Sequence, residues 1–379
     1  MGRAHLFVDI SAHGFGHLAQ VAPVLEALKQ RLPELRLTIR SGLPTDKLRA
    51  RLSANFTHLH ESSDFGYVMH DAVSLDLEAT ALAYRRQHAD WEALVDRDAR
   101  LFNELQPDLV FTDVAYLPLA GAARAGIPSV AMCSLNWAEL FAHFFAREDW
   151  AAAIHHQMLE AYKSAECFLR ATPGMAMADL PRLRPIGPLA ALGRDCRQEL
   201  QAQLGCSDEE RVVLVAFGGV EKQLPINDWP ALPGLRWLVP QAWRVNHPNA
   251  ADLEPLHRPI IDLLRSVDAV LTKPGYGTFA EAACNGTPLL YLRREDWPEQ
   301  DFLIDWLQLH GRCKEVGEGD LRAGRLQPAL ERLWSQATPP TPQPSGAEEA
   351  AAALVPWLTR SEQDLVVHKA RWSHCPLTD

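Results

Sequence analysis

The residues from Lys273 to Ala282 have types and a spacing that suit the binding of an anion and a diol. They read Lys-Pro-Gly-Tyr-Gly-Thr-Phe-Ala-Glu-Ala. Gly275 and Gly277 allow a sharp turn and let backbone amides approach a ligand without an intervening Cβ. We expect a helix over residues 278–285, with Gly277 in its first turn, where unpaired N–H groups and the helix dipole favour an anion such as a diphosphate. Glu281 lies about one turn further along and can accept hydrogen bonds from two neighbouring ribose hydroxyls.

The segment before Lys273 indicates that a buried strand leads into this stretch. Residues 267–272 form a short apolar run with β-branched members, which is typical of a buried parallel strand. Strand, glycine turn and helix start would then meet at one ligand. The alternative is an ordinary βα turn in which the glycines serve only packing, because glycine-rich turns are common in doubly wound sheets.

A second group of candidate residues follows the first predicted strand. His13 and His17 are four residues apart, as in zinc-binding helices, but glycines lie between them and no nearby carboxylate or cysteine completes a ligand set, so we predict no metal. At a helix N-terminus His17 would be kept neutral by the dipole, as a general base requires. Asp113, at the end of another predicted strand, can accept from the other ring nitrogen and hold the tautomer. The alternative is that His17 caps a helix and Asp113 is a turn residue.

Composition restricts the class of protein. A chain of 379 residues is long enough for two domains. Its net charge of -11 disfavours nucleic acid or an anionic membrane as partner. No run approaches the roughly 18 apolar residues of a transmembrane helix, and the N-terminus lacks the apolar region of a signal peptide. Seven cysteines without a C-x-x-C pair argue against disulfides and zinc, so we expect a reducing cytoplasm.

Apolar runs and helical patterns alternate along the chain, which predicts an α/β fold of two doubly wound parallel-sheet domains. The predicted strands cover residues 4–11, 35–40, 107–113, 128–135, 167–171, 211–219, 235–239, 268–272 and 288–292. Prolines and glycines at 181–195 indicate a linker. The expected division is a first domain over 1–180, a second over 196–358 and a tail over 359–379. Ligands bind at the carboxyl ends of such strands, so we expect an interdomain cleft, its acceptor side shaped by the irregular residues 45–75.

These residues together resemble the GT-B glycosyltransferases, a superfamily with two facing Rossmann-like domains. The motifs that carry the resemblance are His13–His17, Pro107–Asp113, Pro185–Leu189, Phe217–Gly219, Gly275–Ala282 and Trp297–Gln300. A narrower resemblance, over roughly residues 4–335, is to the glycosyltransferase-like N-terminal half of plant L-arabinokinases, here without the kinase domain. It adds the segments Lys273–Ala282 and Leu292–Glu295.

The resemblance implies a role for each matching residue. It makes the first domain the acceptor domain and the second the donor domain. His17 would be the general base and Asp113 its orienting partner, with His13 as an additional ring that leaves the choice of base open. The donor-binding residues would be Gly218, Gly219, Lys273, Gly275, Gly277 and Thr278 for the diphosphate, Glu281 for the ribose, and Glu299 and Gln300 for the hexose. Lys273 departs from the small polar residue usual there, and it either neutralises phosphate charge or forms a surface ion pair. Arg293 and Arg294 are either donor contacts or a solvated charge run.

The implied function is transfer of a sugar from a nucleoside-diphosphate sugar, such as a UDP-sugar, to the hydroxyl of an unidentified acceptor. The hexosyltransferase reaction would be metal-independent, without cofactor, and inverting. A nucleotide-sugar epimerase or hydrolase is the alternative enzyme, because it uses the same fold and donor cleft. A third possibility is a non-catalytic regulatory protein that binds a sugar nucleotide.

Overall fold

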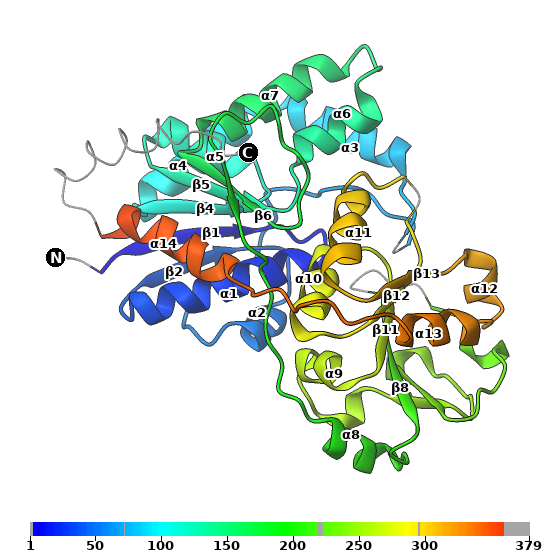
Figure 1. The fold of residues 1–379 in the computed structure, drawn as a ribbon. Helices are drawn as coiled ribbons and strands as arrows, with labels where there is room; N and C mark the ends of the chain where they lie inside the picture. Colours follow the sequence, from blue (N-terminus) through cyan, green and yellow to red (C-terminus); the bar gives the residue numbers. More distant parts are fainter. Residues whose placement is uncertain (1–2, 72, 218–222, 295, 360–379) are drawn as a thin grey trace.

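Two parallel β-sheets form the framework of the molecule (Figure 1). The computed structural model describes residues 3–71, 73–217, 223–294 and 296–359. Within these residues the first sheet has seven strands in the order β3-β2-β1-β4-β5-β6-β7, and the second has six in the order β10-β9-β8-β11-β12-β13. Every pairing between these strands is parallel.

The first sheet and its helices come from the N-terminal half of the chain. Its elements are β1 (His5–Ile10), α1 (Phe15–Arg31), β2 (Arg36–Arg40), α2 (Thr45–Arg51), β3 (Thr57–Leu59), α3 (Leu77–Ala89), α4 (Trp91–Leu105), β4 (Leu109–Asp113), α5 (Leu117–Ala125), β5 (Ser129–Cys133), α6 (Trp137–Phe145), α7 (Ala151–Ser164), β6 (Cys167–Ala171) and β7 (Leu183–Ile186).

The second sheet follows after a crossing segment. The α-helices and strands of this second half of the chain are α8 (Arg197–Leu204), β8 (Arg211–Ala216), β9 (Leu235–Val239), β10 (Ala250–Asp252), α9 (Ile260–Ser266), β11 (Ala269–Thr272), α10 (Tyr276–Asn285), β12 (Leu289–Tyr291), α11 (Glu299–His310), β13 (Cys313–Glu315), α12 (Glu318–Arg322), α13 (Gln327–Trp334) and α14 (Gly346–Leu358).

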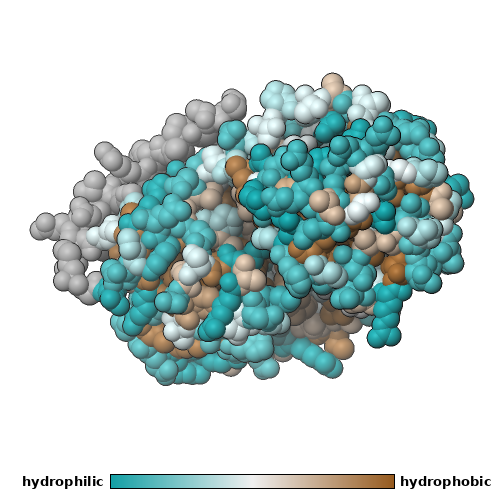
Figure 2. Space-filling model, turned by 90° about the horizontal axis from the view of Figure 1, so that it is seen from below, coloured by the Kyte–Doolittle hydropathy of each residue, from teal (hydrophilic) through white to brown (hydrophobic). Residues whose placement is uncertain are grey.

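Apolar strands buried on both faces explain the layered arrangement. In β8, Val212 and Leu214 pack into one hydrophobic cluster, whereas Val213 and Val215 pack into another on the opposite face. Alternating side chains of a strand point to opposite faces, so helices must cover both. The first of these clusters also contains residues of β1, α1, α10 and α14, and it therefore joins the two sheets. On the face shown in Figure 2, most residues are hydrophilic and the hydrophobic ones lie in small groups.

The strand order places two ligand-binding positions opposite each other. It reverses between β1 and β4 in the first sheet and between β8 and β11 in the second. At such a reversal the loops after neighbouring strands diverge and leave a crevice at the carboxyl edge of the sheet. Residues 11–14, 114–116 and 273–275 follow three of these strands directly. Contacts between α1 and α10 bring the two crevices together.

The predicted strands are all present, and several boundaries differ from prediction. The predicted helical region 77–105 is the pair α3 and α4, and α10 begins two residues earlier than expected, at Tyr276. Within the predicted linker 181–195, residues Leu183–Ile186 form β7 and pair with β6. The predicted tail lies outside the described residues from 360 onward.

The helix α14 lies with the first sheet, although its residues belong to the predicted second domain. It packs against α1, and residues 335–345 carry the chain back across the molecule (Figure 1). Ala350, Ala351 and Leu354 are buried in the shared hydrophobic cluster. The apolar face of α14 thus finds its partner in the first half of the chain, which local sequence cannot indicate.

No helix of the described residues combines the length with the apolar character that a bilayer-spanning helix needs.

A buried ion-pair network ties β1, β2 and α4 together. The guanidinium of Arg40 donates to both carboxylate oxygens of Asp98, at 2.8 and 2.7 Å, and to Asp9. Ser63 donates to the other oxygen of Asp9 at 2.6 Å. All three charged side chains are at most 2% exposed. Because a buried charge without its partner is strongly unfavourable, each of the three requires the others.

We expect Asp98→Ala to lower the free energy of unfolding by about 3–5 kcal/mol, because Arg40 would stay buried with one carboxylate fewer. Urea denaturation followed by circular dichroism measures this change. Glu61→Ala is the matched control, since Glu61 pairs with Arg97 at 3.1 Å on the surface and should contribute less than about 1 kcal/mol. Equal effects of the two substitutions would contradict the assignment of Arg40 to a buried network.

Candidate functional site

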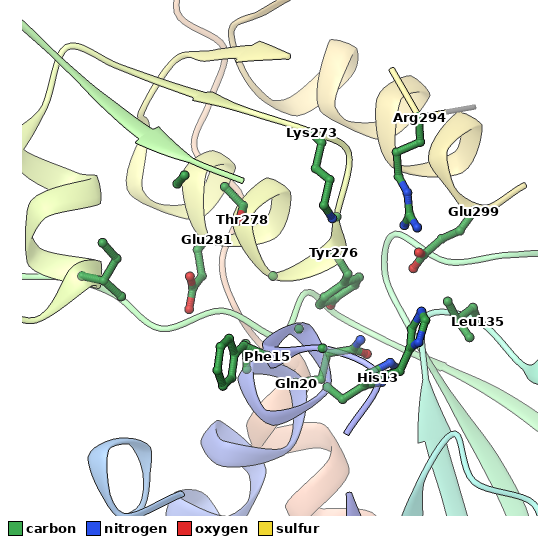
Figure 3. Close-up of a pocket in the computed structure, with 18 of the residues that line it drawn as sticks. His13, Phe15, Gln20, Leu135, Lys273, Tyr276, Thr278, Glu281, Arg294 and Glu299 are labelled. Atoms are coloured by element: carbon green, nitrogen blue, oxygen red, sulfur yellow. The ribbon is translucent and has the colours of Figure 1, made fainter. Parts of the chain in front are cut away.

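A single cavity of about 310 Å³ lies between the carboxyl edges of the two sheets (Figure 3). Residues from both halves of the chain line it. From the first half these include His13, Gly14, Phe15, Gly16, His17, Gln20, Arg51, Met69 and Leu135, and from the second half Lys273, Gly275, Tyr276, Gly277, Thr278, Glu281, Arg294, Trp297 and Glu299. Of the predicted site residues within the described chain, all but Asp113 and Gln300 line this cavity directly.

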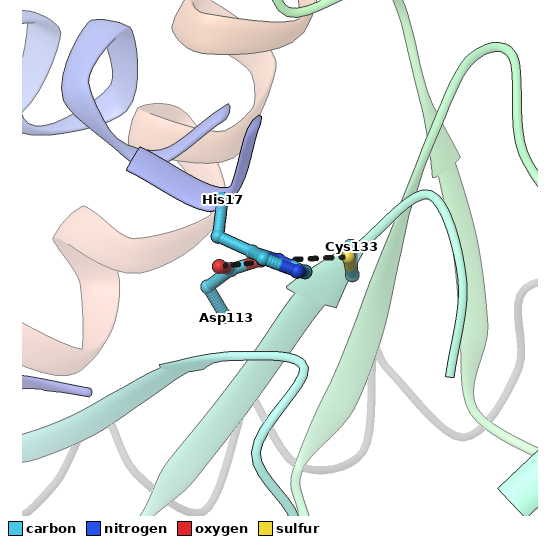
Figure 4. Close-up of side chains that lie close together, drawn as sticks. All are labelled: His17, Asp113 and Cys133. Carbon is cyan, nitrogen blue, oxygen red and sulfur yellow. Dashed lines mark hydrogen bonds and ion pairs between the residues drawn. The ribbon is translucent and has the colours of Figure 1, made fainter. Parts of the chain in front are cut away.

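His17 and Asp113 meet at the first-sheet wall (Figure 4). His17 lies in the first turn of α1, and Asp113 is the last residue of β4. The Nδ1 atom of His17 is 2.9 Å from Oδ2 of Asp113, and both side chains are buried. The contact is not aligned as a hydrogen bond, and neither Asp113 oxygen has an aligned donor among the described residues. Asp113 therefore acts on His17 mainly through its charge.

Charge and burial oppose each other in this pair. Burial lowers the pKa of His17, but the carboxylate of Asp113 outweighs it and holds the pKa of His17 well above its usual value. Burial also raises the pKa of Asp113, against the charge of His17. Both directions favour retention of a proton by the pair, which titrates as a unit. The sequence-based expectation of a neutral His17 considered only the helix dipole and missed this larger effect.

Cys133 is a third member of this group that the sequence did not indicate. Its Sγ atom lies 4.0 Å from His17 Nδ1, at the end of β5. Potential metal ligands of His17, Asp113 and Cys133 lie within 4.8 Å of one another. Burial raises the pKa of the Cys133 thiol to about 11, and a neutral thiol is a poor metal ligand. The absence of a metal stays a prediction. It considered the spacing of His13 and His17, and not the group that His17 forms with Asp113 and Cys133.

His13 has a different environment from His17. Its ring stacks on Trp297, with centroids 6.0 Å apart, and its Nδ1 accepts from the backbone N–H of Tyr67 at 3.3 Å. Burial and the positive charges of His17, Arg294 and Lys273 lower the pKa of His13 to about 3. His13 is therefore neutral at physiological pH. The close approach of Gly66 explains a glycine there, since it has φ of +64° and an added Cβ would lie 2.6 Å from the His13 ring.

The start of α10 forms the second-sheet wall. Gly275 precedes the helix, and Tyr276, Gly277 and Thr278 make its first turn. Their backbone N–H groups have no partner within the helix and carry the positive end of its dipole. An added Cβ at Gly277 would lie 3.2 Å from Ala19 of α1, so a glycine permits the two walls to approach this closely.

Glu281 makes an ion pair across the cavity. Its Oε1 atom is 3.1 Å from Nη1 of Arg51, the last residue of α2. Burial raises the pKa of Glu281, while the charge of Arg51 opposes the shift. Arg51 thus favours the ionised carboxylate that a ribose diol requires. Arg51 and Met69 both come from residues 45–75, whose helical and strand segments the sequence did not reveal.

Lys273 and Arg294 place two cations side by side in the cavity (Figure 3). Burial and the charge of Arg294 lower the pKa of Lys273 to about 7, against the opposing effect of Glu299. Burial lowers the pKa of Arg294 to about 10. The guanidinium of Arg294 lies 3.9 Å from the ring centroid of Trp297, which holds it in place. Because both pKa values are lowered, the charged forms of the two side chains are disfavoured in the free protein, and a negatively charged ligand would stabilise them.

Glu299 and Gln300 have separate roles in the structure. Glu299 lines the cavity and accepts hydrogen bonds from Ser134 at 2.7 Å and from Trp297 Nε1 at 3.1 Å. Gln300 instead holds the backbone of Arg294, accepting from its N–H at 2.9 Å and donating to its carbonyl at 3.1 Å. Gln300 thus positions the Arg294 loop, whereas Glu299 faces the cavity. Arg293 pairs with Asp301 away from the cavity.

Three further features complete the comparison with the predicted site. Gly218 and Gly219 lie outside the described residues. Tyr276 was not predicted, and its hydroxyl donates to the carbonyl of Thr172 at 3.0 Å and accepts from the N–H of Leu189 at 2.8 Å. Gln20 was also missed, although its position three residues after His17 on a predicted helix puts both on one face.

No protein-family model matches the chain. An L-arabinokinase of Arabidopsis thaliana is 26% identical over 339 residues, covering 86% of this chain and 32% of that protein. The chain thus spans about a third of the length of this curated relative.

Solved structures similar to this one are glycosyltransferases. A UDP-glucosyltransferase from Polygonum tinctorium has a TM-score of 0.57 at 18% identity, covering 95% of this chain and 99% of that one. The calicheamicin glycosyltransferase CalG4 has a TM-score of 0.59 at 16% identity, covering 98% and 97%. UGT89C1 of Arabidopsis thaliana in complex with UDP has a TM-score of 0.56 at 16% identity, covering 98% and 100%. The chain therefore has the GT-B fold, as predicted, and both resemblances expected from the sequence are confirmed.

We expect Asp113→Asn to lower the pKa of His17 below its ordinary value, because burial would then act without the opposing carboxylate. Titration of the His17 ring carbon signal by NMR measures this directly. The signal of His143, which lies 2.8 Å from Asp296 on the surface, is the internal control and should be the same in the two proteins at each pH. An unchanged pKa of His17 in the variant would show that Asp113 does not govern its protonation.

Proposed function

We propose that this chain is a glycosyltransferase that moves a sugar from a nucleoside-diphosphate sugar to an acceptor hydroxyl. The observation that carries the proposal is the cavity itself, in which the His17–Asp113 pair faces the start of α10, Lys273 and Glu281. A base on one wall and an anion-binding wall opposite it are the two parts that such a transfer needs. The names of the similar structures, which include UDP-glucosyltransferases and a UDP complex, support a UDP-sugar as donor.

The donor would bind along the second-sheet wall. Its diphosphate would accept hydrogen bonds from the N–H groups of Gly277 and Thr278 and lie near Lys273 and Arg294. Glu281 would accept from the ribose hydroxyls, and the charge of Arg51 favours the ionised form that this requires. Glu299 would accept from a hydroxyl of the sugar, because its carboxylate lies on the same wall between Trp297 and Ser134.

The acceptor hydroxyl would approach from the first-sheet wall. The deprotonated form of the pair would act as the base: with Nδ1 of His17 against Asp113, its Nε2 atom would take the hydroxyl proton as the oxygen attacks the anomeric carbon. The bond to the diphosphate breaks in the same step, and the leaving phosphate gains the charge that the amides and cations of the opposite wall stabilise. A single displacement of this kind inverts the anomeric centre. Because these residues supply both base and charge stabilisation, the reaction proposed is metal-independent.

His17 is the proposed base and His13 the supporting ring. His17 has a carboxylate at 2.9 Å that stabilises the imidazolium formed on proton transfer. The low pKa of His13 makes it a weak proton acceptor. His13 instead packs between Trp137 and Trp297, where it shapes the acceptor side of the cavity.

The proposal is tested by calorimetric titration with UDP, GDP, ADP and dTDP, with and without EDTA, followed by a transfer assay. We expect one diphosphate, UDP, to bind irrespective of EDTA, and Glu281→Ala to weaken its binding at least about tenfold through loss of charged hydrogen bonds. Glu199→Ala, an exposed ion-paired glutamate of α8, is the control. Absence of diphosphate binding in the unaltered protein would refute the donor site.

In the transfer assay His17→Ala should retain UDP binding and lose about 10²–10⁴-fold in turnover, the usual contribution of a positioned base. His143→Ala is the matched surface control. Sugar release without an acceptor would instead identify a hydrolase, and binding of the sugar nucleotide without any product would identify a regulatory binding protein.

We expect the affinity for UDP to fall as the pH rises from 6.5 to 8.5. Lys273 has a pKa of about 7 in the free protein, so above this pH a proton must be taken up before the cation can meet the diphosphate. Lys273→Arg keeps the charge at every pH and should flatten the pH dependence of the affinity. Comparison of the two proteins also cancels the effect of the titration of UDP itself, which is the same for both. An equal slope in both proteins would exclude Lys273 from the diphosphate site.

A further inference from the structure

A second cavity, of about 230 Å³, lies at the opposite edge of the second sheet from the site just described. It is lined by residues at the amino ends of strands and by the loop after α10. Arg211 begins β8, Asp268 precedes β11, and Arg312 precedes β13. Since the strands are parallel, the length of β11, about 13 Å for four residues, separates this cavity from the Lys273 wall.

Four arginines surround the cavity, and we call it the arginine cavity. They are Arg197, Arg211, Arg265 and Arg312. Asp268 is the acidic residue among those that line it, and it pairs with two of them, Arg197 at 2.9 Å and Arg211 at 2.7 Å. In the described part of the chain, Arg265 and Arg312 form no ion pair. Four cations against one carboxylate leave a formal excess of three positive charges.

Helix dipoles reduce this excess without removing it. α9 and α10 both end at the cavity, near Val267 and Gly286. Each helix C-terminus carries roughly half a negative charge, so the two together neutralise about one of the three. The remaining charge, about two, matches that of a phosphate dianion.

The other polar groups of the cavity are already hydrogen-bonded within the protein. Thr287 donates to the carbonyl of Leu264 at 2.9 Å, and the side-chain amide of Asn285 donates to the carbonyls of Ala191 and Glu281. Asp268 also accepts from the N–H of Val212 at 2.8 Å. The guanidinium groups of Arg265 and Arg312, with the remaining N–H groups of Arg197 and Arg211, are donors left for a ligand among the described lining residues.

Trp334 helps to hold the cavity in shape. Its indole N–H donates to the carbonyl of Asp268 at 3.0 Å, and the guanidinium of Arg211 lies 5.5 Å from its ring centroid. Arg211 is thus fixed between a carboxylate and an aromatic ring, which lowers the entropy lost when its remaining N–H groups meet an anion.

We propose that the arginine cavity binds a phosphate group, either as inorganic phosphate or as part of a small phosphorylated metabolite. Planar guanidinium groups suit the oxygens of a phosphate because each can donate two parallel hydrogen bonds. The net charge of -11 on the whole chain makes a small anion the appropriate ligand rather than a nucleic acid. This site is independent of the donor cavity and of the function proposed for it.

The test is calorimetric titration with inorganic phosphate at constant ionic strength, because exposed charges are sensitive to salt. The variant is Arg265→Gln combined with Arg312→Gln, two side chains whose loss breaks no ion pair of the described chain. Arg100→Gln, an exposed arginine of α4, is the matched control. Lys273→Ala removes a cation of the donor cavity and reveals any phosphate bound there. Thermal unfolding of each variant confirms that it is folded.

We expect saturable binding that weakens at least tenfold in the double variant and persists in Arg100→Gln and Lys273→Ala. Glycerol 3-phosphate distinguishes the two sources of phosphate, since tighter binding of this monoester indicates a metabolite and weaker binding indicates the free ion. The proposal is overturned if the unaltered protein binds neither compound, if the double variant binds as well as the unaltered protein, or if Lys273→Ala alone abolishes binding.

Discussion

Parallel pairing of every described strand is the constraint on which the rest of the molecule depends. It gathers all strand carboxyl ends of a sheet at one edge, and the reversal of strand order opens a crevice at that edge. Contacts of α1 with α10 and a hydrophobic cluster shared by both sheets bring the two edges together. The cavity of the proposed reaction is therefore a consequence of topology, and the side chains at the strand ends supply its chemistry.

The chemistry of the cavity is set by partly and fully buried charges that are unequally matched. On one wall His17 has its own carboxylate, Asp113, at 2.9 Å. On the other, among the described residues, Lys273 and Arg294 share the carboxylate of Glu299, which is also held by Ser134 and Trp297. The charge on the first wall thus has its own counter-charge, whereas a bound anion would stabilise the two cations on the second wall. This asymmetry separates the base from the phosphate-binding side.

The same βα unit connects the two anion-binding regions of the second sheet that we propose. β11 leads from Asp268 at the arginine cavity to Lys273 at the donor cavity, and α10 returns from Tyr276 to Asn285. Asn285 donates to the backbone carbonyl of Glu281 at 2.8 Å, so the far end of α10 is joined by hydrogen bonds to the residue proposed to hold the ribose. Between the two ends of α10, Phe279 and Ala280 are buried in the hydrophobic cluster shared by both sheets.

Sequence by itself determined the α/β class, most of the strands and the residues at their carboxyl ends, because apolar periodicity and glycine spacing are local properties. It did not indicate β3, β7, β10 and β13. It indicated His17, Asp113, Lys273, Glu281 and Glu299, all of which the structure brings to one place. The start of α10 was misplaced by only two residues. These residues lie at or just after the ends of strands, and the apolar pattern of the sequence can reveal where strands end.

Tertiary structure alone decided which residues and helices contact one another. Arg51 reaches Glu281 from a helix 230 positions earlier in the chain, Cys133 joins His17, and α14 packs against α1. It also decided the protonation of His17, since the dipole expected from its position is outweighed by a carboxylate from another strand. Electrostatic and packing energies depend on distance in space rather than separation in sequence, so no local pattern contains them.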